Sequence, residues 1–112
     1  MSEVFVTNEF IDWYDNADDA VVDDIIKAVT RLEVLGVTLG YPESSSIKGS
    51  KYPLRELRIQ SHGRPIRVFY IFDPVRNAVL LIGGDKTGDK RFYKRMIPLA
   101  ERLWEEYLDE RF

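Results

Sequence analysis

Two arginines on neighbouring predicted strands, Arg58 and Arg67, are the residues of this chain best suited to chemistry. They flank a predicted hairpin turn, so we expect them to be near neighbours. Two converging guanidinium groups would suit a phosphate and its pentacoordinate transition state, because arginine binds phosphate oxygens bidentately and stays charged. The alternative is an exposed strand face with solvated arginines, one of them paired with Glu56. Arg55 is an odd number of residues from Arg58, so without a bulge the two lie on opposite faces.

A basic segment follows the last predicted strand. Its five cations are Lys86, Lys90, Arg91, Lys94 and Arg95. The segment is not a P-loop, because that motif needs a lysine directly after its second glycine, and here Asp89 follows Gly88. Cations at the start of a helix oppose the helix dipole, and binding an anion is one reason to place them there. A solvated helix start is the simpler explanation.

Proton transfer has three candidate side chains, one histidine and two tyrosines. His62 is the only histidine, and its ordinary pKa near 6.5 suits a general acid or base. It falls in a predicted hairpin turn, where a polar residue is also unremarkable. Tyr93 and Tyr70 could donate protons or stack on bases, and either is more simply a core or rim residue.

Charge is distributed unevenly along the chain. Residues 47–95 carry 12 Lys and Arg against 4 Asp and Glu, whereas residues 1–46 carry 2 against 10. A basic patch raises the local concentration of phosphate even on a protein whose net charge is −3. Arg55 and the cations Lys90, Arg91, Lys94 and Arg95 are therefore candidate contacts for a nucleic-acid backbone.

Composition argues against several other kinds of site. The absence of cysteine excludes disulfides, thiolate zinc sites and thiol nucleophiles. Asp73, Asp85 and Asp89 match no metal-ligand spacing, and no Gly-x-Ser-x-Gly turn is present. We therefore expect neither a metal ion nor a cofactor.

With 112 residues, of which 45% are apolar, the chain is predicted to fold as one domain over residues 1–112. The N-terminus has no basic region and no long apolar stretch, so we expect no signal peptide. No window approaches the roughly 20 apolar residues that span a bilayer. These features favour a soluble cytoplasmic protein.

Hydrophobic spacing predicts strands at 3–6, 54–60, 65–72 and 78–82 and helices at 9–15 and 89–110. A further helix is predicted between an N-cap at Asp18 and a stop at Gly36. In the strand at 54–60 the apolar pattern places Leu54 and Leu57 on one face, and Glu56 disturbs the strict alternation. Pro98 predicts a kink or break in the last helix, and residues 37–53 are expected to be loop. The order is β-α-α-β-β-β-α, and the short connections require antiparallel pairing. We expect an α+β fold with a small antiparallel or mixed sheet of about four strands and helices packed on one side.

Three segments together resemble the RelE/ParE toxin superfamily. They are Leu54-Arg55-Glu56-Leu57-Arg58, Ile66-Arg67-Val68-Phe69-Tyr70 and Val79-Leu80-Leu81-Ile82-Gly83-Gly84-Asp85-Lys86. Members of the superfamily show a Glu-Leu-Arg sequence and an arginine that is followed by a hydrophobic residue and then two aromatic residues. They also show an apolar strand that ends in a lysine-containing turn before a terminal helix. The most similar branch is that of HigB-type toxins, also described as phage-derived Gp49-like proteins.

The resemblance implies a RelE-like fold and the toxin half of a type II toxin–antitoxin pair. Such toxins are usually metal-independent mRNA endonucleases that act at the ribosome, where the RNA 2′-hydroxyl attacks the adjacent phosphate. By position, Arg58 and Arg67 would stabilise the phosphorane, and Lys86 would bind phosphate or assist proton transfer. Tyr93 and His62 are the remaining catalytic candidates. The implied partners are mRNA, the ribosome and a helix-turn-helix antitoxin encoded beside the toxin.

Two departures from the family pattern leave alternatives open. Many relatives carry a Phe-x-Lys-Lys turn where this chain has Gly83-Gly84-Asp85-Lys86-Thr87, and many have a catalytic His or Tyr near a C-terminus that is acidic here. The chain could therefore be a gyrase-inhibiting toxin of the ParE type, which shares the fold. It could also be a catalytically inactive, toxin-like module that binds an antitoxin.

Overall fold

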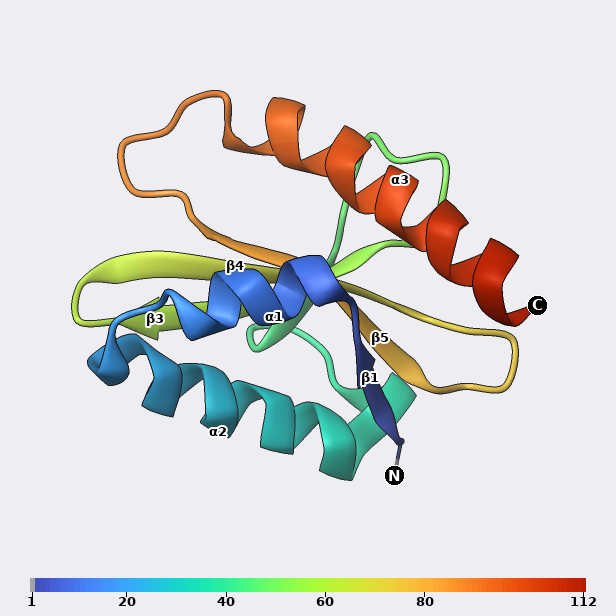
Figure 1. Cartoon of the computed structure of the whole chain (residues 1–112). Helices are drawn as coiled ribbons and strands as arrows, with labels where there is room; N and C mark the ends of the chain where they lie inside the picture. Colours follow the sequence, from blue (N-terminus) through green and yellow to red (C-terminus); the bar gives the residue numbers. More distant parts are fainter. Residues whose placement is uncertain (1) are drawn as a thin grey trace.

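One mixed sheet organises the chain (Figure 1). The computed structural model describes residues 2–112. Its elements are β1 (Val4–Val6), α1 (Asn8–Asp15), α2 (Asp19–Leu35), the 3₁₀ turn η1 (Gly36–Thr38), β2 (Ser44–Ser46), β3 (Arg55–Ser61), β4 (Arg64–Phe72), β5 (Ala78–Asp85) and α3 (Phe92–Arg111). The strands lie in the order β1-β5-β4-β3-β2, with β1 parallel to β5 and every other pair antiparallel. The predicted α+β class and element order are confirmed.

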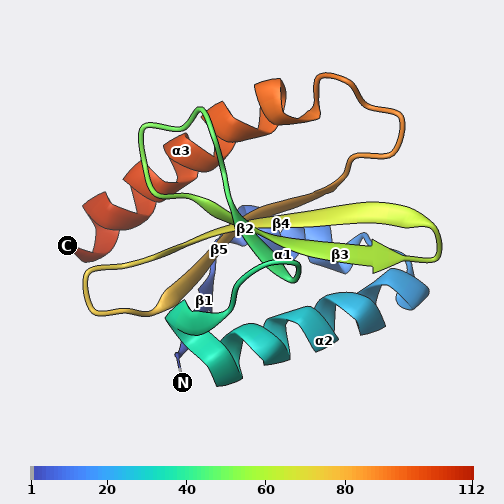
Figure 2. The ribbon, with the colours of Figure 1, turned by 180° about the vertical axis from the view of Figure 1, so that it is seen from behind.

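The fifth strand, β2, lies inside the segment that was expected to be loop. Its three serines have no hydrophobic period, so nothing in their sequence predicts a strand. They pair with β3, with Ser44 opposite Leu57, and the buried Ser44 hydroxyl shares a hydrogen bond with the Tyr70 hydroxyl. The connection from β2 to β3 extends toward α3 (Figure 2). There the Ser50 hydroxyl and the Lys51 backbone N–H donate hydrogen bonds to the Glu101 carboxylate of α3.

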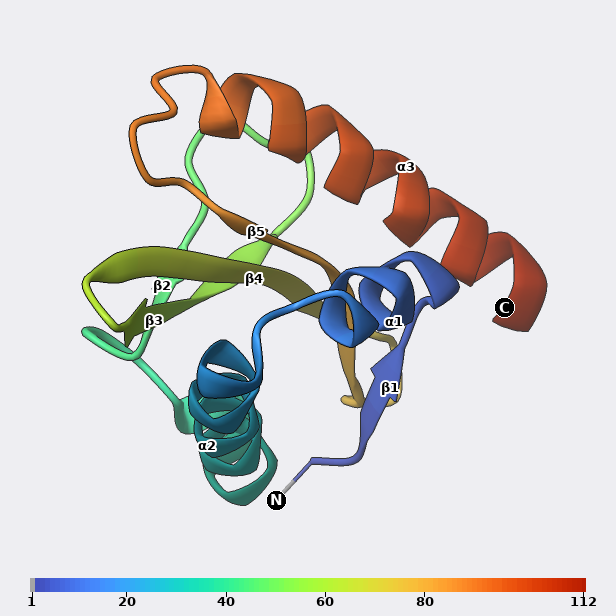
Figure 3. The ribbon, with the colours of Figure 1, turned by 60° about the vertical axis from the view of Figure 1, so that its left-hand side comes forward.

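Helices cover both faces of the sheet, so the expectation that they pack on one side is wrong (Figure 3). Strand alternation sends successive side chains of β4 to opposite faces. Val68 and Tyr70 enter the core under α1 and α2, whereas Phe69 and Ile71 enter the core under α3. The central strands are therefore apolar on both faces, and the fold has three layers.

The ends of α1 and α2 follow ordinary capping rules. The Thr7 hydroxyl accepts a hydrogen bond from the Phe10 N–H at 2.9 Å and donates to the Leu81 carbonyl at 2.6 Å, which fixes the start of α1 to β5. Asp18 precedes α2, as predicted, and Gly36 ends it with a φ of 53°, in the left-handed region that favours glycine.

The terminal helix α3 is one continuous helix that contains Pro98, and it begins at Phe92, three residues later than predicted. Its second half is tied to the β4–β5 turn. The Tyr107 hydroxyl donates to the buried Asp73 carboxylate at 2.9 Å, and the backbone N–H groups of Val75 and Asn77 donate to the same carboxylate. No helix within residues 2–112 has the length and apolar character needed to cross a membrane.

Strand β5 continues through Gly83 and Gly84, which were expected to end it. The two glycines face opposite layers. An added Cβ at Gly83 would lie 2.3 Å from the Trp13 ring, and one at Gly84 would lie 2.8 Å from the Phe92 ring. Only a hydrogen fits at each position, so these glycines allow α1 and α3 to pack closely on the strand that leads to Lys86.

Gly83→Ala is expected to lower the free energy of unfolding by about 1–3 kcal/mol, because the new methyl group overlaps the Trp13 ring. Urea denaturation measures this cost. Gly40→Ala is the control, since its Cβ would meet only the Thr38 carbonyl at 4.0 Å, and its cost should stay within about 0.5 kcal/mol. Equal stabilities of the two variants would contradict the close packing of α1 on β5.

Candidate functional site

A buried ion pair joins β3 and β4 on the face that α3 covers. Arg67 Nε lies 3.6 Å from Glu56 Oε1, and the two side chains are only 8% and 7% exposed. Arg67 also donates to the Ile66 carbonyl at 3.1 Å, while its Nε finds no hydrogen-bond acceptor within the described residues. Removing two charges from water is costly, so this pair must be held by the surrounding fold.

Tyr93 and Lys86 extend the ion pair toward solvent. From the first turn of α3, the Tyr93 hydroxyl donates to Glu56 Oε1 at 2.7 Å. Lys86 lies just after β5, and its ammonium nitrogen is 5.1 Å from the centroid of the Tyr93 ring. We call Glu56, Arg67, Tyr93 and Lys86 the Glu56 cluster. It brings together side chains from β3, β4, the turn after β5 and α3.

The position of Lys86 is set by its turn. The Lys86 backbone N–H donates to the Pro65 carbonyl at 3.0 Å, which continues the β4–β5 ladder by one residue. Asp85 Oδ1 accepts hydrogen bonds from the Thr87 N–H and hydroxyl at 2.9 and 2.6 Å. Partial burial opposes the charge on Asp85, but these hydrogen bonds and the nearby Arg64 hold its pKa below the usual range. The turn therefore keeps its shape at neutral pH.

Arg58 lies directly opposite Arg67 in the β3–β4 ladder, as the hairpin predicted. Unlike Arg67, it is exposed. Its guanidinium reaches the edge of the sheet, 5.2 Å from the centroid of the Tyr41 ring. Tyr41 is itself 76% exposed, and Arg58 forms no ion pair within residues 2–112, so an aromatic face and an unpaired cation lie together at this edge. The two paired arginines differ in surroundings, one buried and ion-paired and the other open to a ligand.

Two predicted site residues lie outside the cluster. Arg55 is on the opposite face of the sheet, where its Nε donates to the Ser44 hydroxyl at 3.1 Å. Its odd spacing from Arg58 indicated this outcome, since β3 has no bulge against β4.

His62 is exposed at the tip of the β3–β4 hairpin, where it and Gly63 have φ values of 51° and 78°. Such angles are those of a two-residue hairpin turn, and no hydrogen bond or ion pair within residues 2–112 joins His62 to the cluster.

The remaining predicted cations surround the start of α3 and leave it rich in positive charge. Lys90, Arg91, Lys94 and Arg95 are all exposed. Only Arg95 among them forms an ion pair within the described residues, with Asp89 at 2.8 Å. Because the first turn of α3 contains no acidic residue, this end of the helix adds its own positive potential beside Lys86 and Tyr93.

The Tyr93 phenol holds its proton at neutral pH. Burial, together with the hydrogen bond that it donates to Glu56, raises the pKa of Tyr93 above the usual range, and the Arg67 charge only partly opposes this shift. A phenol in this state can donate a hydrogen bond or a proton. It can accept a second proton only if it passes its own to Glu56.

Glu56 is the residue that sequence reasoning missed. The pattern had placed Leu54 and Leu57 on one strand face, with Glu56 as an irregularity. In the structure Leu54 packs under α3 and Leu57 under α2, so regular alternation points Glu56 inward beside Arg67. The sequence did contain a signal for Glu56, because strict alternation from Leu54 places this carboxylate at an inward position. A buried charge needs a partner, so an inward Glu predicts a neighbouring cation.

The fold and the Glu56 cluster together define the class of protein. It is an α+β protein with a RelE-like sheet, and its cationic cluster lies at the start of the last helix. The chain belongs to the family of phage-derived Gp49-like proteins, whose family model matches residues 12–105. The resemblance first noted in the β3, β4 and β5 segments is thus confirmed.

Two relatives from Mycobacterium tuberculosis carry the names of HigB toxins. HigB3 is 37% identical over 98 residues, which cover 86% of this chain and 84% of that protein. HigB2 is 32% identical over 99 residues, which cover 86% of this chain and 49% of that protein. The chain thus matches most of HigB3 and about half of HigB2.

A solved structure supports the fold alone. The solution structure of the conserved protein HP0894 from Helicobacter pylori superposes with a TM-score of 0.53 at 18% identity, and the match covers 78% of this chain and 97% of that one.

Glu56→Ala is expected to lower the free energy of unfolding by about 3–5 kcal/mol, because it leaves the Arg67 charge buried without a counter-charge. The matched control is Glu106→Ala, which breaks the exposed Arg102–Glu106 pair and should cost at most about 0.5 kcal/mol. Chemical denaturation of both variants gives the comparison. Similar losses in the two would show that the Glu56–Arg67 pair is not a structural constraint.

Proposed function

We propose that this chain is the toxin of a type II toxin–antitoxin pair and that it cleaves mRNA without a metal ion. The observation that carries the proposal is the juxtaposition of Arg67, Glu56, Tyr93 and Lys86 in one connected cluster, with Arg58 across the ladder. Membership of the Gp49-like family and the HigB names of two relatives support the toxin role.

Two cations, the exposed Arg58 and the half-buried Lys86, are suited to hold the scissile phosphate. Arg58 is exposed and unpaired with any carboxylate within the described residues, and Lys86 stands beside Tyr93. Both can contact non-bridging oxygens and stabilise the extra negative charge of the phosphorane. Arg67 is buried, so it acts mainly by fixing Glu56 and by adding positive potential beneath the phosphate.

The hydrogen bond between Tyr93 and Glu56 offers a path for the proton of the attacking group. The RNA 2′-hydroxyl gives its proton to the Tyr93 oxygen while Tyr93 gives its own proton to Glu56. The 2′-oxygen then bonds to phosphorus, and the bond from phosphorus to the 5′-oxygen breaks. Lys86 protonates the departing 5′-oxygen. The products are a 2′,3′-cyclic phosphate and a 5′-hydroxyl end.

The setting of this reaction follows from the toxin role. We expect the chain to act in the cytoplasm on mRNA at the ribosome, and to be neutralised by an antitoxin of the helix-turn-helix class encoded beside it. The cations around the start of α3 would hold the RNA backbone on either side of the cleavage point.

Induced expression of the native chain should arrest growth and cut a reporter transcript, which primer extension detects. Arg58→Ala and Lys86→Ala should each reduce cleavage about a hundredfold or more, because each removes a charge that stabilises the transition state. Lys48→Ala, which removes an exposed lysine from the β2–β3 connection, is the matched control and should cleave like the native chain.

Three outcomes would contradict the proposal. Undiminished cleavage by soluble Arg58→Ala and Lys86→Ala protein would remove the assigned cations from the chemistry. Growth arrest with intact transcripts and damaged DNA would favour a gyrase inhibitor. Absence of arrest, combined with tight binding to the neighbouring gene product, would favour an inactive antitoxin-binding module.

A further inference from the structure

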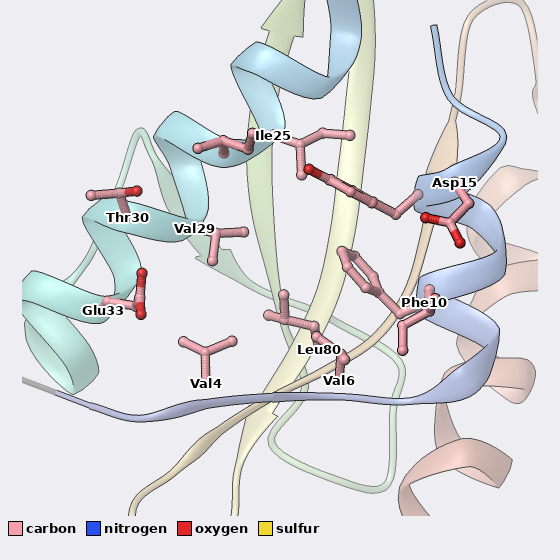
Figure 4. A pocket seen from close by; sticks show the side chains of 12 residues that line it. Val4, Val6, Phe10, Asp15, Ile25, Val29, Thr30, Glu33 and Leu80 are labelled. Atoms are coloured by element: carbon pink, nitrogen blue, oxygen red, sulfur yellow. The ribbon is translucent and has the colours of Figure 1, made fainter. Parts of the chain in front are cut away.

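An apolar groove opens on the face of the sheet opposite the Glu56 cluster, between α1, α2 and β1 (Figure 4). Its volume is about 420 Å³. Val4 and Val6 point from β1 toward the space between the two helices, and Leu80 of β5 lies behind them. One wall is a stripe of α2, and the other is the side of α1 that carries Phe10. The α2 stripe consists of Ile25, Ile26, Val29, Thr30 and Glu33.

Apolar side chains at this groove remain in contact with water. Val6, Ile11 and Ile26 line it and are 43%, 39% and 48% exposed. Val34 continues the exposed apolar surface near the end of α2. Single exposed apolar residues are ordinary on protein surfaces, but several gathered in one hollow are typical of a binding surface.

The groove has an acidic rim. Asp15 and Glu33 line it from α1 and α2. Asp19 and Asp23 are exposed and precede Ile26 on α2 at helical spacing, so they extend the same stripe. The rim therefore attracts a partner that carries Lys or Arg beside its apolar residues.

We infer that this groove is where the antitoxin docks, and that the docking element is an amphipathic helix with an apolar stripe and basic flanks. The inference rests on the toxin role proposed above, which supplies the partner. A helix fits better than an added strand, because the groove is walled by side chains from two helices and floored by side chains of β1. Strand addition would instead use the backbone edge of β1.

The test measures antitoxin binding by groove variants. The antitoxin encoded beside the toxin gene is purified, and its affinity for each variant is measured by calorimetry. Ile26→Asp should weaken binding about tenfold or more, since it places a charge in the apolar contact. In cells, this variant should arrest growth even when the antitoxin is co-expressed, because the Glu56 cluster on the other face is unchanged.

Two further variants keep the result interpretable. Val75→Asp changes a similar exposed residue in the β4–β5 turn, outside the groove, and should bind the antitoxin and be neutralised like the native chain. Glu33→Lys changes only an exposed rim charge, so it tests the acidic rim even if Ile26→Asp folds poorly, and it should also weaken binding. Circular dichroism checks the fold of each variant.

Native affinity in both Ile26→Asp and Glu33→Lys would overturn the inference. So would a native dimer that Ile26→Asp dissociates, seen by sedimentation, with antitoxin affinity unchanged, because the groove would then belong to a second copy of the chain. If the native chain fails to arrest growth, the proposed toxin role fails, while the measured affinities still decide what the groove binds.

Discussion

A carboxylate buried between an arginine and a tyrosine is the constraint on which the rest of this molecule depends. Glu56 lies 3.6 Å from Arg67 and accepts a hydrogen bond from Tyr93, so one side chain connects β3, β4 and α3. In the absence of bound RNA, neither charge could remain at this depth without the other. The same hydrogen bond that fixes the start of α3 also holds Tyr93 beside Lys86. A change at Glu56 would therefore affect both the stability of the fold and the proposed proton transfer.

The fold keeps the two ends of α3 in place so that this contact persists. At one end, Gly84 lets Phe92 approach β5, and at the other, Tyr107 donates to the buried Asp73. The two faces of the sheet then carry different surfaces. The face under α3 presents cations suited to phosphate, whereas the face under α1 and α2 presents an apolar groove with an acidic rim. The opposite net charges of residues 47–95 and 1–46 reflect this division.

Sequence alone could predict whatever depends on local rules. The bounds of α2 follow from its apolar stripe between Asp18 and Gly36, and the pairing of Arg58 with Arg67 follows from alternation about a tight turn. It could not predict what depends on tertiary contact. β2 forms because β3 offers a free edge, and β5 continues through Gly83 and Gly84 because both residues pair with β4. The inward direction of Glu56 was hidden because Leu54 had been grouped with the wrong face.

The most direct measurement is the ionisation of Tyr93 with and without Glu56. The difference in alkaline phenol absorbance between the native chain and Tyr93→Phe isolates this residue, and the same difference is taken in a Glu56→Gln background. In the native chain, Tyr93 should ionise above the ordinary tyrosine pKa of about 10. In Glu56→Gln its pKa should fall, because the negative neighbour is gone while Arg67 remains. A Tyr93 pKa that is the same in both backgrounds would contradict the account.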